Sequence, residues 1–238
     1  MANLYIVSTP IGNLEDITLR AIKTFFKVDI IACEDTRRTG VLLNHLLSLA
    51  KLLKLKPTKP KLISYYEENE LQRVPEIINF LKKGKNVALV SNAGTPTLAD
   101  PGFKLVKECL QRGIKVIPIP GASGVLAALV VSGLATDRFI FLGYLPKKRE
   151  KKRKALSELF LSLKRFKKGW TVIFYESPHR LKETLENLRS IFGDIKISIA
   201  RELTKVHEEV WQGKISQALL QFSKPKGEFT LLFRTPPK

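Results

Sequence analysis

Short apolar runs alternate with amphipathic segments along the first half of the chain. The runs have the length and composition of buried strands, and they lie at Leu4–Ser8, Asp29–Glu34, Lys61–Tyr65, Asn86–Ser91 and Lys115–Ile119. Between them, apolar residues recur at helical spacing, as in the sets Ile17, Ala21, Ile22, Phe25 and Val74, Ile77, Ile78, Leu81. This alternation predicts a mainly parallel sheet with helices on both faces.

After Pro120 the pattern starts again with a helix of small residues, Ala122–Leu134. Further strands are predicted at Phe139–Tyr144, Thr171–Glu176, Lys196–Glu202, Glu209–Gly213 and Glu228–Arg234. Because the third and fourth of these leave no room for a helix between them, the second sheet is predicted to be mixed or antiparallel. We therefore expect two α/β domains, residues 1–120 and 121–238.

Three loops carry more glycine and proline than a simple change of direction requires. The stretch VALVSNAGTPTLADPG, residues 87–102, passes from a buried strand into such a loop. The other two are STPIGNLED (8–16) and PIPGASG (118–124). Each follows a predicted strand of the first sheet, where α/β proteins bind ligands beyond the carboxyl ends of strands. Glycine allows a ligand to approach the backbone, so these loops are candidate ligand loops, although each alone would also suit a tight turn.

Several familiar sites are absent from the sequence. It contains no G-x-x-x-x-G-K-[ST] loop, no G-x-G-x-x-G after the first strand and no G-x-S-x-G. The three histidines are far apart, so no metal site is expected. An organic ligand without strong negative charge, held largely by backbone contacts, fits the loops best.

The chain is strongly basic, with 41 Lys and Arg against 22 Asp and Glu and a net charge of +19. Residues 121–238 hold 23 of the basic and 11 of the acidic side chains. Such an excess favours a polyanionic partner, above all nucleic acid. A lysine-rich thermophile surface is the alternative, but such surfaces are usually balanced by glutamate.

The basic residues are densest in 145–170, where seven of the eight residues from Lys147 to Lys154 are Lys or Arg. The segment continues as an amphipathic helix with Leu156, Leu159, Phe160 and Leu163 on one face, and it closes with Lys164, Arg165, Lys167 and Lys168. A solvated helix face is the plain alternative. The density favours contact with the phosphate backbone of a nucleic acid, through Lys147, Lys148, Arg149, Lys151, Lys152, Arg153 and Lys154.

Compartment and membrane signals are weak. The two cysteines, Cys33 and Cys109, lie in apolar segments and are expected to be core thiols rather than a disulfide. No apolar run is long enough to span a membrane, and the N-terminus does not resemble a signal peptide. We expect a cytoplasmic protein.

Six motifs occur in order: STPIGNLEDITLRA, CEDTR, SNAGTPTLADPG, PIPGAS, FYESPHR and ARELTK. Together they closely resemble the ribosomal small-subunit RNA 2′-O-ribose methyltransferases of the tetrapyrrole methylase superfamily. The resemblance implies two α/β domains with S-adenosylmethionine in the cleft between them, and commonly a homodimer. It also implies methylation of a cytidine ribose in the decoding region of 16S ribosomal RNA within the small subunit.

The resemblance and the loop positions together suggest which residues hold the cofactor. In the first domain and at the start of the next helix these are Pro10, Gly12, Gly94, Thr95, Pro96, Ala122, Ser123 and Gly124. From the second domain we expect Tyr175, Leu203 and Thr230 to close over the adenosine. For Leu203 and Thr230, ordinary strand packing is the alternative.

Two departures from the family pattern affect this interpretation. Asn92 stands where members often carry Asp, so a charged contact there is lost. The chain ends soon after GEFTLLFR, whereas longer members continue, so RNA docking is expected to rely on Lys147–Lys168.

The charged motifs supply candidates for catalysis. A ribose hydroxyl needs a base or a stabilising cation, and the candidates lie in CEDTR, ESPHR and RELTK. Glu34 and Lys205 are candidates for deprotonating the ribose hydroxyl. Arg37, His179 and Arg180 are candidates for contact with RNA. Arg37 is also a candidate catalytic residue. The alternative is that these charges only brace the domain interface.

Two other functions remain open at this point. One is methylation of a corrin or porphyrin carbon by an enzyme of the same fold, which would not require the basic run. The other is a non-catalytic RNA-binding protein of ribosome assembly, which would not require the glycine- and proline-rich loops.

Overall fold

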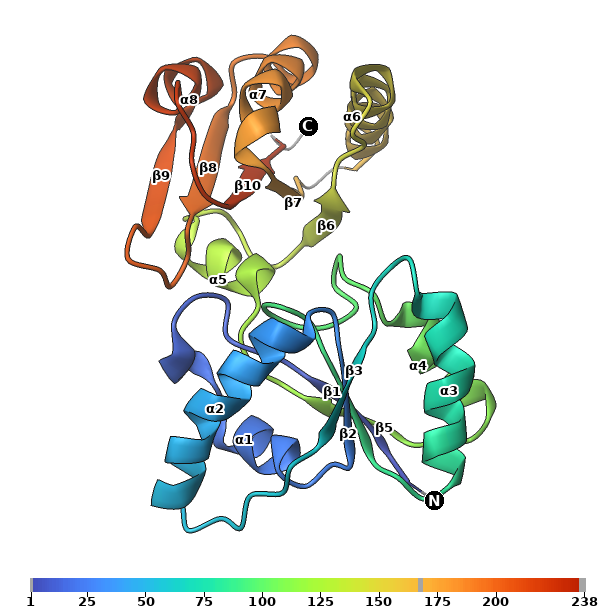
Figure 1. The fold of residues 1–238 in the computed structure, drawn as a ribbon. Helices are drawn as coiled ribbons and strands as arrows, with labels where there is room; N and C mark the ends of the chain where they lie inside the picture. The colour runs from blue at the N-terminus through green and yellow to red at the C-terminus, as the bar shows by residue number, and fades with distance from the viewer. Residues whose placement is uncertain (1, 167–168, 236–238) are drawn as a thin grey trace. The chain divides into compact units, whose positions relative to one another are not determined.

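The computed structural model describes residues 2–166 and 169–235, and Figure 1 shows their arrangement. The chain divides into two compact units, Met1–Ser123 and Gly124–Lys238. The sequence places the boundary at Pro120, and the structural division falls after Ser123, directly before a helix.

The first unit alternates strands and helices from end to end. Its strands are β1 (Leu4–Val7), β2 (Ile30–Cys33), β3 (Lys61–Ser64), β4 (Val87–Val90) and β5 (Val116–Ile119). Its helices are the short η1 (Leu14–Asp16), α1 (Leu19–Phe25), α2 (Thr36–Leu52), α3 (Glu70–Lys82) and α4 (Phe103–Gln111). All five strands pair in parallel, in the order β3-β2-β4-β1-β5, which confirms the predicted parallel sheet.

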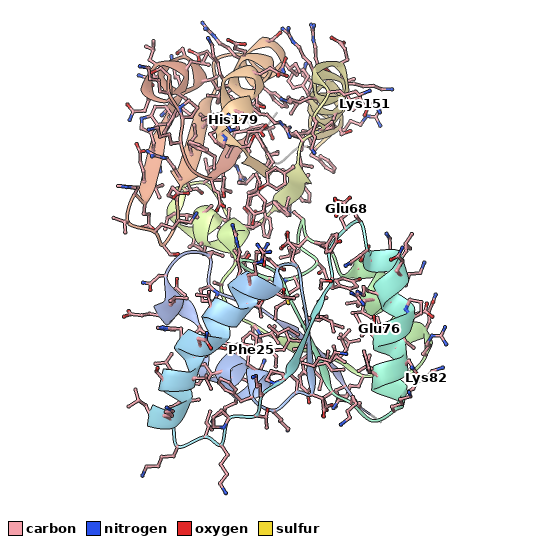
Figure 2. All side chains as sticks on the ribbon, viewed as in Figure 1. Phe25, Glu68, Glu76, Lys82, Lys151 and His179 are labelled. Atoms are coloured by element: carbon pink, nitrogen blue, oxygen red, sulfur yellow. The ribbon has the colours of Figure 1, made fainter. Side chains whose placement is uncertain are left out.

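Both faces of this sheet are buried, which explains why its strands read as continuous apolar runs. In β4, Val87 and Leu89 join the core beneath α3 and α4, whereas Ala88 and Val90 join the core beneath α1 and α2. Phe25 of α1 is fully buried in the second of these cores (Figure 2).

The second unit contains a mixed sheet. Its strands are β6 (Phe139–Tyr144), β7 (Thr171–Glu176), β8 (Lys196–Arg201), β9 (Glu209–Lys214) and β10 (Phe229–Arg234), in the order β6-β7-β10-β8-β9. Its helices are α5 (Gly124–Val131), α6 (Arg149–Leu163), α7 (Pro178–Phe192) and α8 (Ile215–Gln221). Only β6 and β7 are parallel, and β8 and β9 form the predicted antiparallel pair without a helix between them.

Helix α5 is shorter than the predicted 122–134. It begins at Gly124 and ends at Val131 because the next residues form a turn of their own. The Ser132 hydroxyl donates to the Leu129 carbonyl and accepts from the Leu134 N–H, while Gly133 takes a φ of 65°. A left-handed residue ends a helix, and glycine adopts that conformation without a Cβ clash.

The amphipathic helix predicted in the basic segment is present as α6. Leu156 and Leu163 are buried in the core beneath α6 and α7, Leu159 packs against that core, and the Phe160 ring meets Phe192 edge to face. Lys167 and Lys168, which were predicted to close the helix, lie outside the described residues.

Lys152 departs from the predicted RNA-facing row, because its side chain is completely buried. Its ammonium donates to Glu183 Oε1 at 3.2 Å and to Thr184 Oγ1 at 3.1 Å, both on α7. Helical periodicity turns this one position of the basic run inward, where a buried ammonium must be paired to offset its desolvation. Lys152 is therefore a brace between α6 and α7 and not an RNA contact.

Replacing Lys152 with alanine removes these hydrogen bonds and leaves a void beneath α6. We expect the free energy of unfolding, measured by urea denaturation, to fall by about 2–5 kcal/mol. Lys151→Ala is the matched control, since Lys151 is exposed on the same helix (Figure 2), and should change it by less than about 0.5 kcal/mol. Equal stability of the Lys152→Ala and wild-type proteins would contradict the brace.

Candidate functional site

The three glycine- and proline-rich loops meet at one edge of the first sheet. They leave β1, β4 and β5, which are neighbours in the sheet and end at the same side. Thr9 and Gly94 form an antiparallel bridge between two of them, with N–H···O distances of 2.9 and 3.1 Å. The loops thus form one assembly, as their positions after the strands predict.

Thr95 connects all three loops through its hydroxyl. Thr95 Oγ1 lies 2.8 Å from Ser8 Oγ and donates to the Ala122 carbonyl at 3.1 Å. The third loop approaches the first closely, since a Cβ on Gly121 would lie 3.0 Å from Ser8 Cβ. Pro10 and Pro96 are buried in this assembly, Gly12 is exposed, and Ala122 and Ser123 are half-buried.

Gly94 has a structural reason to be glycine. Its φ is 80°, and a Cβ there would lie 3.3 Å from Ile11 Cγ2. Its glycine character is therefore explained by the backbone conformation and by packing against the first loop, independently of any ligand.

The segment from Thr97 to Gly102 is conformationally strained. Thr97 and Ala99 have φ values of 74° and 63°, which non-glycine residues rarely adopt. Gly102 has a φ of 135°, and a Cβ there would lie 2.6 Å from Leu89 Cδ2. Strain of this kind persists only where surrounding contacts enforce it, and it is concentrated at functional sites.

Glu70 holds the strained segment in place at its Gly102 end. Its buried carboxylate accepts from the Gly102 N–H at 3.0 Å and from the Tyr65 hydroxyl at 2.7 Å, and it pairs with the Lys104 ammonium at 2.9 Å. Burial alone would raise the pKa of Glu70, but the hydrogen bonds from Lys104, Tyr65 and Gly102 outweigh it and hold the pKa below the ordinary 4.5.

Two carboxyl groups flank the start of the β4 loop. Glu34, directly after β2, accepts from the Asn92 N–H at 3.4 Å. Asp100 is largely buried, and burial, with a smaller contribution from the charge of Glu34, raises its pKa to about 6 despite a hydrogen bond with Ser91. Within the described residues, Asn92 Oδ1 is buried and has no hydrogen-bond partner. This edge of the sheet therefore offers a free acceptor beside a carboxyl that titrates near neutral pH.

Asp100 is the functional candidate that the sequence did not single out. A Pro/Gly loop by itself does not mark a carboxyl group as reactive, and the raised pKa of Asp100 arises mainly from burial, with a smaller contribution from the charge of Glu34. The loop itself was the available signal, since a carboxyl inside a predicted ligand loop is a candidate for proton transfer.

In the second unit, Tyr175, Leu203 and Thr230 gather near the carboxyl end of β7. Thr230 pairs with Tyr175 across the sheet, and Leu203 and Tyr175 both pack against the core beneath α5. Thr230 is 6% exposed, which favours the packing interpretation for this residue. A Cβ on Gly124 would lie 3.2 Å from the Tyr175 hydroxyl oxygen. That these residues form a cofactor cleft with the first domain stays a prediction from the sequence.

Lys205 is poorly suited to accept a proton. Burial lowers its pKa, but hydrogen bonds to Glu202 Oε1 at 2.9 Å and Glu228 Oε2 at 3.0 Å dominate, and the pKa lies above 10.5. These contacts hold Lys205 as a cation and disfavour the predicted role as a base, which stays a prediction. The backbone around it is strained, with φ values of 49° at Glu202 and 64° at Thr204.

Arg180 is engaged within its own unit. Its guanidinium lies 3.2 Å from the Glu176 carboxylate and donates to the carbonyls of Leu145 and Pro146 at 2.6 and 3.2 Å. It fixes the start of the basic segment, and its predicted contact with RNA stays a prediction. His179 and Arg37 are exposed, at the starts of α7 (Figure 2) and α2 respectively, as are Lys147, Lys148, Arg149, Lys151, Arg153 and Lys154.

Two kinds of site are not found in the part of the chain that the structure describes. No group of three or more His, Cys, Asp or Glu side chains there could hold a metal ion. None of the described helices is both long and apolar enough to cross a membrane. The functional groups found among the described residues are thus the backbone groups of the three loops, the carboxyl groups near them and the exposed cations.

The comparisons with known proteins all point to methyltransferases. The family model described as Tetrapyrrole (Corrin/Porphyrin) Methylases matches residues 3–219. A protein named ribosomal RNA small subunit methyltransferase I from Thermotoga maritima is 47% identical, over 98% of both chains. One of the same name from Synechocystis is 46% identical, over 98% of this chain and 78% of its own.

A solved structure shares the fold. Uroporphyrin-III C-methyltransferase from Thermus thermophilus, in a complex with S-adenosyl homocysteine, has a TM-score of 0.63 over 97% of both chains at 15% identity. The predicted fold class, a parallel and a mixed α/β unit of the tetrapyrrole methylase type, is confirmed.

Glu70→Gln should test the anchor of the strained segment. Because the folded-state pKa lies below 4.5, the stabilisation from the carboxylate is complete above pH 4.5 and is lost as pH falls through the folded-state pKa. We expect a loss of about 1–3 kcal/mol in the free energy of unfolding at pH 7, shrinking below pH 4.5.

The matched control is Glu76→Gln on the same helix (Figure 2), whose 35% exposed side chain pairs only with Arg73 among the described residues. It should change stability by less than about 0.5 kcal/mol. A Glu70→Gln effect that does not depend on pH would contradict a role for the charge.

Asp100 should titrate with a pKa of about 6, measurable by carboxyl carbon NMR. Since this pKa is raised from 3.8, the stability it confers is complete below pH 3.8 and is lost as pH rises through about 6. Glu34→Gln removes a neighbouring negative charge and should lower the Asp100 pKa. A pKa near 3.8 in the folded protein would show that Asp100 is not buried as described.

Proposed function

Because the chain belongs to the tetrapyrrole methylase family, and within it to the ribosomal RNA small subunit methyltransferases I, we propose that it methylates ribosomal RNA with S-adenosylmethionine. The acceptor is the 2′-hydroxyl of a cytidine in the decoding region of 16S ribosomal RNA. The observation that carries the proposal is the carboxyl edge of the first sheet, where three connected loops lie beside the Asn92 acceptor and the Asp100 carboxyl.

The loop residues fit the cofactor. S-Adenosylmethionine is cationic at its sulfonium and ammonium groups and carries several N–H and O–H donors, so it suits an edge with the unpartnered Asn92 Oδ1 acceptor. The residues that would hold it are Pro10, Gly12, Gly94, Thr95, Pro96, Ala122, Ser123, Gly124, Tyr175, Leu203 and Thr230. When bound, the cofactor supplies a methyl group for in-line displacement by the ribose oxygen.

The chain's own contribution is alignment and proton acceptance. Well-oriented reactants gain on the order of 7–11 kcal/mol from positioning alone. A general base works best with a pKa near the operating pH, and Asp100, with its pKa of about 6, meets that condition. Lys205, held as a cation by Glu202 and Glu228, is suited to stabilise negative charge.

The RNA is bound by exposed cations. These are Arg37, His179, Lys147, Lys148, Arg149, Lys151, Arg153 and Lys154. The proposed substrate is the assembled small subunit in the cytoplasm, and the enzyme acts as a homodimer, as the resemblance implies. A tetrapyrrole substrate fits less well, because its carboxylates do not require a run of surface cations and because the relatives at 46–47% identity carry the ribosomal RNA name.

The test uses methyl-labelled S-adenosylmethionine and small subunits that lack the modification. After reaction, the RNA is digested to nucleosides and the label is located by mass spectrometry. Label in 2′-O-methylcytidine is the expected result. Label on a base, or none despite measured cofactor binding, would contradict the proposal.

Asp100→Asn tests the base in the same assay. We expect kcat to fall by about 10²- to 10⁴-fold while affinity for S-adenosylhomocysteine stays within about threefold. Glu108→Gln on α4, whose side chain pairs with Arg112, is the matched control and should leave kcat unchanged. An unchanged kcat in Asp100→Asn would exclude Asp100 as the base.

A further inference from the structure

The edge strand β6 contains an irregularity next to its carboxyl end. Phe141 pairs with Ile173 and Tyr144 with Tyr175, so β6 advances three residues where β7 advances two. Gly143 lies within this bulge, with a φ of 63°. In a regular ladder Gly143 would lie opposite Tyr175, so the extra residue brings Tyr144 to that position instead. Bulges of this kind redirect side chains and occur next to functional sites.

The redirected Tyr144 ring lies on an aromatic support. Tyr175 meets Phe141 edge to face at 5.1 Å and meets Tyr144 in a tilted contact at 5.5 Å. Phe141 and Tyr175 pack against the core beneath α5, whereas Tyr144 is 55% exposed. The outermost ring is therefore fixed by its neighbours while more than half of its surface faces solvent.

The densest positive charge of the chain follows immediately. β6 leads directly into α6 (Figure 1), and Lys147, Lys148 and Arg149 between them are exposed. Arg180 donates hydrogen bonds to the carbonyls of Leu145 and Pro146. These bonds fix the backbone that connects Tyr144 to the three cations.

An exposed aromatic ring followed closely in the chain by three exposed cations matches the chemistry of single-stranded RNA. The bases stack on aromatic side chains, and the phosphates between them are bound by lysine and arginine. The ring is uncharged and tolerates any base, whereas the cations contribute affinity that depends on salt.

We propose that Tyr144 is a stacking platform for an unpaired base of the RNA substrate, with the phosphates beside that base bound by Lys147, Lys148 and Arg149. The choice of RNA rests on the proposed function. The stacking role of Tyr144 is an additional site, separate from methyl transfer.

The probe is fluorescein-labelled oligouridine, compared with an abasic ribose-phosphate strand of the same length and charge, in equilibrium titrations at several salt concentrations. The wild-type protein should bind oligouridine more tightly than the abasic strand. Tyr144→Ala should weaken oligouridine binding by about 5- to 150-fold and abolish the preference, with an unchanged salt slope. Tyr144→Phe, which keeps the ring, should stay within about threefold of wild type.

Two controls separate stacking from other effects. Phe139→Ala removes a 38% exposed ring at the opposite end of β6 and should leave the preference intact. The double variant Lys147→Ala/Lys148→Ala should keep the preference but reduce the salt slope by about 0.7 for each lost phosphate contact.

The outcomes distinguish this inference from the proposed function. Tyr144-dependent binding of oligouridine without methylation of small subunits would support the platform and contradict the methyltransferase. An unchanged base preference in a folded Tyr144→Ala protein would overturn the platform. A loss of S-adenosylhomocysteine affinity in Tyr144→Ala equal to the loss of RNA affinity would also overturn it, because the ring would then belong to the cofactor site.

Discussion

The buried carboxylate of Glu70 is the contact that keeps the strained ligand loop in place. Left-handed backbone at non-glycine residues costs on the order of 1–3 kcal/mol each, and the segment from Thr97 to Gly102 contains two. That conformation persists because Gly102, Tyr65 and Lys104 all converge on one carboxylate. Since Glu70 begins α3 and Lys104 lies in α4, the loop is fixed by the same helices that cover one face of the sheet.

The fold was largely predictable because its strands are short, buried and apolar, a pattern that depends on neighbouring residues alone. The positions of the three candidate ligand loops were predictable for a similar reason, since glycine and proline mark the turns after the strands. The raised pKa of Asp100 was not, because it comes chiefly from burial in the folded chain, with a smaller contribution from the charge of Glu34. The inward position of Lys152 agrees with helical spacing, but it was not expected, because its pairing with Glu183 and Thr184 depends on residues far along the chain.

The two units differ in their electrostatic character. The first presents acceptors at its sheet edge, in the carboxyl groups of Glu34 and Asp100 and in the unpartnered Asn92 Oδ1. The second presents a run of exposed cations on a helix secured from beneath by Lys152 and Arg180. The inward-facing cations Lys152 and Arg180 thus hold in place the helix and the preceding segment that carry the exposed cations.

The extra residue in β6 also bears on how such a scaffold changes its substrate. The side chain opposite Tyr175 is determined by the count of residues between Phe141 and the end of the strand. Loss or gain of one codon there exchanges the presented side chain while the pairing upstream stays intact. A change of strand length can therefore alter which side chain is presented at this position without any substitution in the strand itself.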